Sequence, residues 1–334
     1  MPIDHHSAVQ VAAAQAGAMA RACGLPGGLP DRAAVLASEL ASNIDKHARN
    51  GALYLQPAAV GRGMDIFGVD RGPGIRDLDQ SFTDGYTTTN TLGAGLGAMR
   101  RIASHFTIRS GAGYGTLAHA WIADPRLPQE QPAAVGALSL PAHGRAECGD
   151  SHALVRHGET WTGLVLDGQG DGPEAAGAVQ RAVRTFRPLA DHGLPEIMTA
   201  LDRALRHTSG AAAALVRTHA DRAEYCVVGD IRVLALSPRG VEPEPAGRPG
   251  VVGHGMPPPR TGTVPWQADS VVLVHTGGVD HRWIRDASAV HLRLPPPLLV
   301  ASLIHSHRRR RDDATALAFG ASQGATCRVT PSAP

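Results

Sequence analysis

Hydrophobic and polar residues follow the periods of helices and then of strands along the first part of the chain. Apolar positions recur at helical spacing over residues 7–23 and 31–49, and Pro30 suits the start of the second helix. Alternating patterns at residues 52–60 and 64–69 indicate the two strands of a hairpin. The other elements expected before residue 125 are a helix at about 96–103 and strands at 105–109 and 116–122.

The patterns begin again after residue 150 and predict a second folded region. Its expected strands are residues 152–156, 161–166, 212–218, 224–228, 231–235, 270–275 and 315–319, and its expected helices are about 174–186 and 194–207. The proline-rich stretch between the regions predicts a linker over residues 126–146. The sequence therefore predicts two domains, over residues 1–125 and 147–322, followed by a tail at 323–334.

The composition favours a folded protein of two domains and gives no indication of nucleic-acid binding. The chain has 334 residues, of which 43% are hydrophobic and 19% charged, and this is enough for two folded cores. Its 32 basic and 30 acidic residues nearly cancel, and aromatic residues make up only 4%, so nothing points to nucleic acid. Four separated cysteines, with no long apolar run and no basic leader, predict a cytoplasmic protein without disulfides or a membrane anchor.

One helix carries polar residues suited to a magnesium-nucleotide site. Glu39, Asn43 and His47 are spaced by four, which places them on one face of the helix predicted over residues 31–49. The amide oxygen of Asn43 can complete a Mg²⁺ shell shared with phosphates, and the Glu39 carboxylate can activate a nucleophile. The alternative is an amphipathic helix whose polar face is only solvated.

A short glycine-containing segment follows the predicted hairpin. Asp70 ends the second strand, where its carboxylate can accept a hydrogen bond from a purine amine. Gly72 and Gly74 allow a ring to approach the backbone closely. The alternative for this segment is an ordinary turn.

A second glycine-rich segment leads into the helix at 96–103. Gly93, Gly95 and Gly97 precede or begin this helix, whose N–H groups and positive N-terminus can cradle a polyphosphate. The alternative is a flexible loop. The pattern G-x-x-x-x-G-K-[ST] occurs nowhere in the sequence, which excludes a P-loop.

Three stretches resemble, in this order, the nucleotide-binding domain of the GHKL superfamily: ELASNIDKHARNG (39–51), DRGPGI (70–75) and DGYTTTNTLGAGLGAMRRIASHFTIRSGAGYGT (84–116). Within the superfamily they look most like the RsbT-like switch kinases and their anti-sigma relatives. The resemblance covers roughly residues 1–123. It implies a GHKL (Bergerat) α/β sandwich that binds ATP with Mg²⁺.

The same resemblance implies roles for individual residues. Asn43 would bind Mg²⁺, and Glu39 would be the base for phosphoryl transfer to a protein serine or threonine. Asp70, supported by Thr116, would hold the adenine. Lys46 would touch a phosphate or remain solvated. The glycines implied in ATP binding are Gly72 and Gly74 beside the base and Gly93, Gly95 and Gly97 as a lid over the phosphates.

Carboxylates at predicted strand ends mark a second candidate site. Asp150 precedes one strand, Asp167 and Gly168 end the next, and Asp312 precedes the last. Carboxylates that converge from strand ends can hold Mn²⁺ or Mg²⁺, and such a metal can lower the pKa of a bound water for attack on a phosphate. Taken singly, each Asp-Gly pair is as well explained by a turn.

The order and spacing of these segments are similar to the SpoIIE and RsbX branch of the PPM protein phosphatases. The likeness covers roughly residues 146–322 and implies a PPM-type α-β-β-α sandwich. It implies that Asp167 bridges two metals with the Gly168 carbonyl, and that Asp150 and Asp312 complete the metal set. Gly277 stands where the family has a metal-binding aspartate, which predicts a weakened phosphatase. Asp280 could replace that aspartate only if its loop were rearranged.

Together the two resemblances imply a fold of class α+β and a bacterial partner-switching regulator. Its kinase-like domain would phosphorylate STAS-domain proteins of an anti-anti-sigma or stressosome system, and its phosphatase-like domain would remove that phosphate. A sigma factor or a downstream phosphatase is a further implied partner. The alternative is a non-catalytic, ATP-binding anti-sigma-type interaction protein whose second domain is a degenerate phosphatase scaffold.

Overall fold

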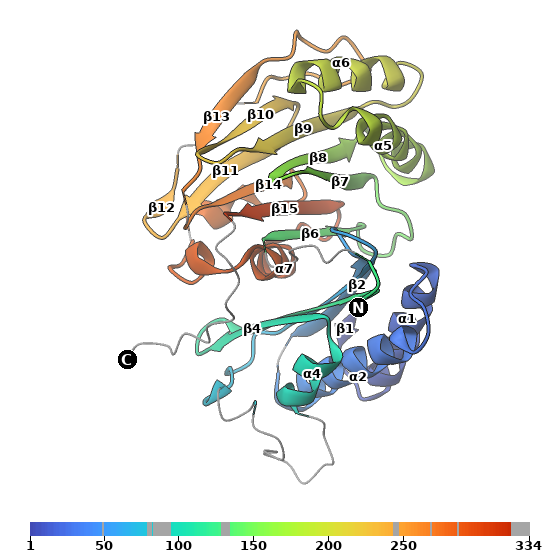
Figure 1. Cartoon of the computed structure of the whole chain (residues 1–334), viewed down its shortest axis with the longest axis vertical. Helices are drawn as coiled ribbons and strands as arrows, with labels where there is room; N and C mark the ends of the chain where they lie inside the picture. Colours follow the sequence, from blue (N-terminus) through green and yellow to red (C-terminus); the bar gives the residue numbers. More distant parts are fainter. Residues whose placement is uncertain are drawn as a thin grey trace. The chain divides into compact units, whose positions relative to one another are not determined.

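The chain divides into two units, one within Met1–Ala133 and the other within Ala134–Ser322 (Figure 1). The computed structural model describes residues 1–48, 50–78, 82, 95–127, 134–242, 247–267, 269–285 and 287–321. Within these residues, none of the helices combines the length and the apolar character that a membrane crossing requires.

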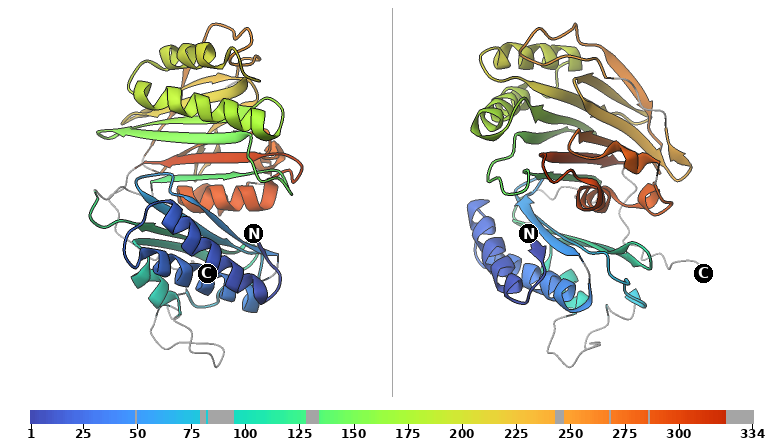
Figure 2. Two further views of the ribbon diagram at one scale, coloured as in Figure 1. Left: turned by 90° about the vertical axis from the view of Figure 1, so that its right-hand side faces the viewer. Right: turned by 180° about the vertical axis from the view of Figure 1, so that it is seen from behind.

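The first unit is an antiparallel sheet with helices on one face (Figure 2). The sheet order is β1-β2-β3-β5-β4, and two long helices pack together over it. The strands are β1 (Pro2–Ile3), β2 (Gly51–Pro57), β3 (Gly63–Val69), β4 (His105–Gly111) and β5 (Gly115–Ala123). The helices are α1 (Ser7–Ala22), α2 (Leu29–His47) and the short α4 (Leu96–Ile102).

Helix α2 is held against the sheet by a stripe of apolar residues. Leu36, Leu40 and Ile44 are spaced by four and are buried, each side chain contributing roughly 1.5–3 kcal/mol through burial. Gly68 in β3 lies beneath this stripe, and a Cβ atom there would make ordinary contact with the Leu40 side chain at 3.4 Å. The polar flank of α2 is thereby placed at the edge of the helix–sheet packing.

The second unit consists, within the described residues, of two antiparallel sheets packed face to face with helices outside (Figures 1 and 2). One sheet has the order β13-β10-β9-β8-β7 and is covered by α5 and α6; the other has the order β12-β11-β14-β15-β6 and is covered by α7. This is the α-β-β-α layering expected for this half of the chain. The strands are β6 (Val135–Leu140), β7 (Asp150–His157), β8 (Thr160–Gly168), β9 (Ala211–Thr218), β10 (Arg222–Val228), β11 (Ile231–Ser237), β12 (Gly240–Val241), β13 (Thr261–Pro265), β14 (Val271–Thr276) and β15 (Ala314–Gly320). The helices are α5 (Gly172–Phe186), α6 (Leu194–Leu205), α7 (Pro296–His307) and the 3₁₀ turns η1 (Arg187–Leu189), η2 (His281–Ile284) and η3 (His291–Arg293).

Where the two sheets of the second unit face each other, a large side chain of one sheet packs against a glycine of the other. The ring of Phe319 on β15 would lie 2.6 Å from a Cβ atom at Gly163 on β8, so only glycine leaves room for it. Gly163 lies inside β8, Phe319 is the last residue but one of β15, and Phe319 is fully buried. The spacing between the two layers is therefore fixed by this contact.

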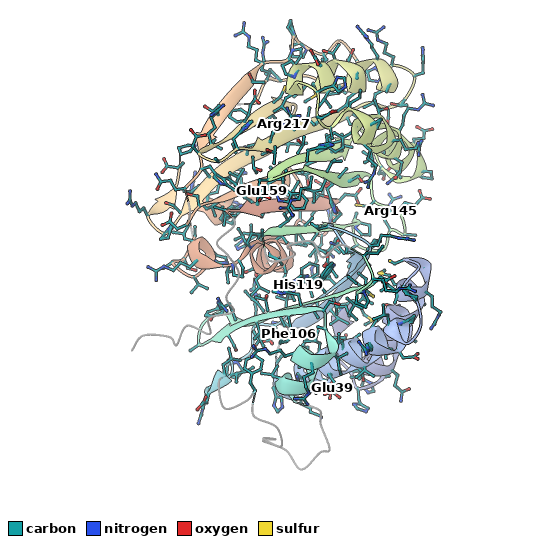
Figure 3. All side chains as sticks on the ribbon, in the orientation of Figure 1. Glu39, Phe106, His119, Arg145, Glu159 and Arg217 are labelled. Carbon is teal, nitrogen blue, oxygen red and sulfur yellow. The ribbon has the colours of Figure 1, made fainter. Side chains whose placement is uncertain are left out.

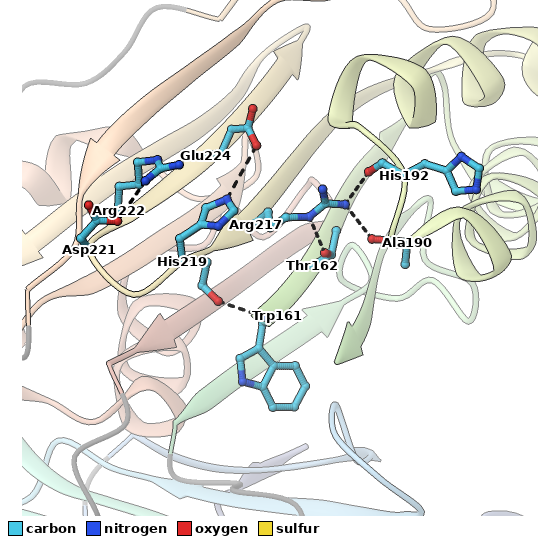
Figure 4. Close-up of polar contacts among 10 residues, drawn as sticks. Trp161, Thr162, Ala190, His192, Arg217, His219, Asp221, Arg222 and Glu224 are labelled. Atoms are coloured by element: carbon cyan, nitrogen blue, oxygen red, sulfur yellow. Dashed lines mark hydrogen bonds and ion pairs between the residues drawn. The ribbon is translucent and has the colours of Figure 1, made fainter. Parts of the chain in front are cut away.

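The connection between α5 and α6 is anchored by Arg217 on β9, as Figure 4 shows. Its guanidinium donates to the carbonyl oxygens of Ala190 at 2.7 Å and His192 at 2.6 Å, and to the Thr162 hydroxyl at 3.0 Å. The guanidinium of Arg217 therefore supplies donors for carbonyl oxygens between the two helices that helix hydrogen bonds do not use. In this way Arg217 connects the helical layer to the sheet beneath it.

The structure differs from the sequence-based elements most clearly in the predicted linker. Residues 126–146 contain β6, which pairs with β15 and buries Val135, Ala137 and Leu138. The prolines on both sides of this short apolar run obscured it. Strands β1, β12 and β13 were also not predicted, and two of them are only two residues long.

Candidate functional site

The polar flank of α2 presents Glu39 and Asn43 one turn apart, both half-buried, as the spacing predicted. Lys46 and His47, nearer the end of the helix, are exposed. Burial raises the pKa of Glu39 and the charge of Lys46 opposes that rise. Glu39 is labelled on α2 in Figure 3. A carboxylate whose pKa is raised is a better proton acceptor, which suits a general base.

Asp70 lies buried at the end of β3 and is brought together with Thr116 at the start of β5. Its Oδ1 atom accepts from the Gly72 N–H at 2.7 Å and from the Thr116 N–H at 3.2 Å. Burial raises the pKa of Asp70, and these hydrogen bonds oppose the rise. Ser110, which no motif indicated, supports the arrangement because its hydroxyl lies 2.9 Å from that of Thr116.

The glycines beside Asp70 are explained by contacts within the protein. A Cβ atom at Gly72 would lie 3.1 Å from the His47 carbonyl, and one at Gly74, where φ is +77°, would lie 2.9 Å from the Gly111 backbone. From the sequence, these glycines are expected to let a ring approach the backbone. The structure gives a different reason, since both positions let backbone pack against backbone.

The predicted lid falls only partly within the described residues. Gly95 is the N-cap of α4, and its carbonyl accepts from the N–H groups of Ala98 and Met99. Gly97 lies in the first turn of this helix. Gly93 lies outside the described residues, so its role in binding phosphates stays a prediction.

In the second unit the strand register brings the predicted carboxylates together. Asp150 on β7 is directly opposite Asp167 on β8, so both side chains emerge on one face. Burial first, and then the charges of Asp312, Asp230 and Asp313, together raise the pKa of Asp167 to about 6. Burial, and then the charge of Asp167, raises the pKa of Asp150 well above its usual range.

Two aspartates in this region accept hydrogen bonds from other groups of the protein. Asp150 accepts a hydrogen bond from the Thr276 hydroxyl at 2.7 Å. Asp313, which the sequence analysis did not single out, accepts from the N–H groups of Ala142 and Gly149, both at 2.6 Å. These two aspartates therefore hold the loops around the site in place.

The other three carboxylates, those of Asp167, Asp230 and Asp312, accept no hydrogen bond and form no ion pair with any described side chain or backbone group. Asp230 follows β10 in the segment VVGDIRVLAL and was not predicted as a site residue. Carboxylate oxygens are the donors that a hard divalent cation prefers.

The described residues hold no ready-made group of three or more His, Cys, Asp or Glu side chains placed to hold a metal ion. Mg²⁺ is commonly bound through one or two carboxylates and several waters, so it does not require such a group. Gly168 is buried at the end of β8, and its N–H donates to the Gly149 carbonyl at 3.0 Å.

The loop after β14 contains Gly277 and Asp280, and Asp280 is paired within this loop. The N–H and guanidinium of Arg282 donate to the Asp280 carboxylate, with a shortest distance of 2.8 Å. These bonds hold the pKa of Asp280 well below its usual range. Asp280 is thus occupied by Arg282 and does not replace the carboxylate missing at position 277.

Comparison with known proteins gives several matches. Residues 157–321 match the family model of SpoIIE, stage II sporulation protein E. A stretch of 81 residues is 40% identical to the serine/threonine-protein kinase RsbT of Bacillus subtilis (strain 168), covering 24% of this chain and 61% of RsbT. A stretch of 146 residues is 25% identical to the phosphoserine phosphatase RsbX of the same strain, covering 42% of this chain and 72% of RsbX.

One solved structure is also similar in fold. It is described as "The bacterial stressosome: a modular system that has been adapted to control secondary messenger signaling", and its TM-score to this chain is 0.51 at 30% sequence identity. The match covers 55% of this chain and 97% of that one. The chain thus spans less than two thirds of RsbT but nearly all of this stressosome-related chain.

Proposed function

Since the second unit is a SpoIIE-type domain of the PPM phosphatases, in a chain of the partner-switching regulators, we propose that it removes phosphate from phosphoserine or phosphothreonine of a STAS-domain protein. The first unit is the opposing ATP-dependent serine/threonine kinase, and both act in the cytoplasm. The observation that carries the proposal is the group of unpaired carboxylates of Asp167, Asp230 and Asp312 at one end of the sandwich.

In the phosphatase unit, Asp167, Asp312, Asp150 and the carbonyl of Gly168 would hold Mn²⁺ or Mg²⁺. Such an ion supplies a Lewis acid and lowers the pKa of a bound water. Thr276 orients Asp150, because its hydroxyl occupies one carboxylate oxygen and leaves the other free. Asp313 fixes the loop at Gly149 and so sets where β7 begins.

In the kinase unit, Asn43 would complete the shell of Mg²⁺ on ATP, and Glu39 would take the proton from the attacking hydroxyl. The raised pKa of Glu39 supports this role. Asp70, held by Thr116, would accept from the adenine amine, with Gly72 and Gly74 shaping that segment. Gly93, Gly95 and Gly97 would cover the phosphates, and the exposed Lys46 is free to reach them.

The phosphatase is tested with purified full-length protein, Mn²⁺ and a phosphorylated STAS-domain protein. The Asp167→Asn variant is expected to lose at least about 100-fold in turnover, as when a metal-activated water is lost. Asp171→Asn is the matched control, since Asp171 is exposed and pairs with Arg145 at the surface. Equal turnover by Asp167→Asn and the unaltered protein would contradict the proposal.

The kinase is tested by transfer of label from γ-labelled ATP to an unphosphorylated STAS-domain protein. Glu39→Gln should abolish transfer, whereas Asp31→Asn, an exposed change in the first turn of the same helix, should leave it intact. Gly277 favours the second candidate function, a non-catalytic ATP-dependent interaction protein that binds STAS proteins or a sigma factor. That candidate is supported instead if ATP binds but no label moves.

A further inference from the structure

The segment RRRRDD between α7 and β15 forms a turn that exposes Arg309, Arg310 and Arg311. These three residues form the arginine turn. Arg308 differs from them, because its guanidinium donates to the Pro141 carbonyl at 3.4 Å. Among the residues that the structure describes, no group pairs with the other three guanidiniums through a hydrogen bond or an ion pair. The turn therefore presents three positive charges whose N–H donors are available to a partner.

The backbone of the arginine turn is held by hydrogen bonds on both sides. The Arg309 N–H donates to the Gly278 carbonyl at 2.8 Å. The His143 N–H donates to the Arg310 carbonyl, also at 2.8 Å. The Asp312 N–H closes the turn by donating to the Arg309 carbonyl at 3.1 Å. Since this backbone is fixed before a partner arrives, ordering it on binding costs little.

The same hydrogen bonds place the arginine turn beside the candidate metal site. Asp312, the next residue, is one of the predicted metal ligands. Arg309 is held by the loop that follows β14. At the end of that strand the Thr276 hydroxyl donates to the Asp150 carboxylate at 2.7 Å. A phosphorylated side chain that reaches these carboxylates therefore brings the chain around it close to the three guanidiniums.

The charge at the turn favours a short acidic segment of a protein. Guanidiniums bind carboxylates through paired N–H bonds. Asp313 and Asp280, both near the turn, are already bonded, Asp313 by two backbone N–H groups and Asp280 by Arg282. The whole chain has 32 basic and 30 acidic residues, and three guanidiniums on one turn do not make the long basic stripe that binds nucleic acid.

We propose that the arginine turn binds an acidic segment of the protein substrate, next to its phosphoserine or phosphothreonine. This inference rests on the phosphatase function proposed above and names a recognition surface for its substrate. The guanidiniums of Arg309, Arg310 and Arg311 pair with carboxylates of that segment, while the phosphate lies at the candidate metal site. Because these contacts are the same before and during the reaction, they lower KM and leave kcat unchanged.

The first measurement is the dephosphorylation of a phosphorylated STAS-domain protein by the full-length protein with Mn²⁺. A turn variant replaces Arg309, Arg310 and Arg311 by alanine. It should raise the KM for the phosphorylated protein at least about fivefold, because three exposed charge pairs are lost. Its kcat for that protein, and its turnover of p-nitrophenyl phosphate, which has no acidic segment, should change by less than about twofold.

The second measurement is binding without turnover, in the absence of Mn²⁺. Fluorescence anisotropy compares two labelled phosphoserine peptides, one with glutamates on both sides of the phosphoserine and one with glutamines. The turn variant should bind the glutamate peptide at least about fivefold more weakly. Its affinity for the glutamine peptide should equal that of the unaltered protein.

A matched control removes three exposed arginines elsewhere on the second unit. Arg184 lies in the last turn of α5, Arg187 follows that helix, and Arg239 lies in the turn after β11. Replacing these by alanine changes the net charge by the same amount and should leave both KM and peptide affinity unchanged. Thermal melts of both variants should match the unaltered protein, since the altered side chains are exposed.

The outcomes separate this inference from the proposed function. Unchanged KM and unchanged peptide affinity in the turn variant would overturn the inference, as would an equal loss in the control variant. Binding of the glutamate peptide that depends on the turn, with no hydrolysis of the phosphorylated STAS-domain protein, would keep the acidic-segment site and overturn the proposed function. Hydrolysis that depends on Asp167 but not on the turn would do the reverse.

Discussion

The hydroxyl of Thr276 donates to the buried carboxylate of Asp150 at 2.7 Å and so joins the two sheets of the second unit at the candidate metal site. The same hydroxyl oxygen accepts from the Thr315 N–H at 3.0 Å. One small side chain thus connects β7, β14 and β15. We therefore expect the arrangement of the candidate metal site to depend on the hydrogen bonds of the Thr276 hydroxyl.

Replacing Thr276 by valine should therefore destabilise the protein. The substitution keeps the shape of the side chain but leaves the buried Asp150 oxygen and the Thr315 N–H without a partner, at a cost of about 1–3 kcal/mol in the free energy of unfolding. Urea titration measures the loss. Thr276→Ser, which keeps the hydroxyl, should stay within about 1 kcal/mol of the unaltered protein; a similar loss for both variants would count against the hydrogen bond.

Adjacent glycines in the loop after β14 should respond very differently to alanine. At Gly278 a Cβ atom would overlap the carbonyl oxygen of Asp313, whereas at Gly277 it would make ordinary contact. Gly278→Ala should lower the free energy of unfolding by at least about 2 kcal/mol, because backbone must move. Gly277→Ala should change it by less than about 0.5 kcal/mol. Thermal melts of the two variants make the comparison, and equal melting temperatures would refute it.

Stability should fall on acidification because of His275. The pKa of this imidazole is lowered to about 4, mainly by burial and to a smaller extent by Arg232 and His281, against the opposing effects of the bond to the Thr276 carbonyl and the charge of Asp230. Since the folded pKa lies below the ordinary 6.5, the contribution of His275 is fully present above pH 6.5. It is lost as the pH falls toward 4, by up to roughly 3 kcal/mol.

Denaturant midpoints measured from pH 7.5 to pH 4 test this expectation. His275→Asn keeps a donor toward the Thr276 carbonyl but does not titrate. Its midpoint should be lower than that of the unaltered protein at pH 7.5 and should change less between pH 6.5 and pH 4. If the two proteins lose stability in parallel over this range, another group is responsible.

Nucleotide binding in the first unit should depend on the charge of Asp70. Asp70→Asn keeps an oxygen for the Gly72 and Thr116 N–H groups, but its amide presents a donor in place of a carboxylate oxygen. Calorimetry with ATP and Mg²⁺ should show affinity reduced by roughly 10–100-fold. Asp31→Asn is the control. Unchanged affinity in Asp70→Asn would remove Asp70 from the nucleotide site.

The sequence predicted which residues lie near each other only where they are close in sequence or belong to consecutive strands. Glu39 and Asn43 share a flank of α2 because helical spacing requires it, and Asp150 meets Asp167 through a short hairpin. Asp230 was missed because only the pairing of β11 with β14 places it beside Gly277. Such long-range register depends on the packing of whole sheets, which no local pattern encodes.

Some residues have contacts that the sequence did not indicate, because one sequence feature has two physical uses. Gly72 and Gly74 fit a ligand-approach motif, yet in the structure they admit the backbone at His47 and Gly111. Asp280 had the right charge for a metal ligand, but the guanidinium of Arg282, two residues further on, holds it. In both cases the deciding neighbour is visible only after the loops have folded.

Strand β6 sets the first residue that a fragment containing only the second unit must include. It pairs along β15, and the Thr315 hydroxyl donates to that of Ser139 at 2.8 Å. A fragment that starts after residue 140 would leave the backbone N–H and C=O groups of β15 that face β6 without partners, although those that face β14 stay paired. Such an edge recruits strands from other molecules, so this fragment would aggregate, and a recombinant phosphatase unit has to begin before Val135.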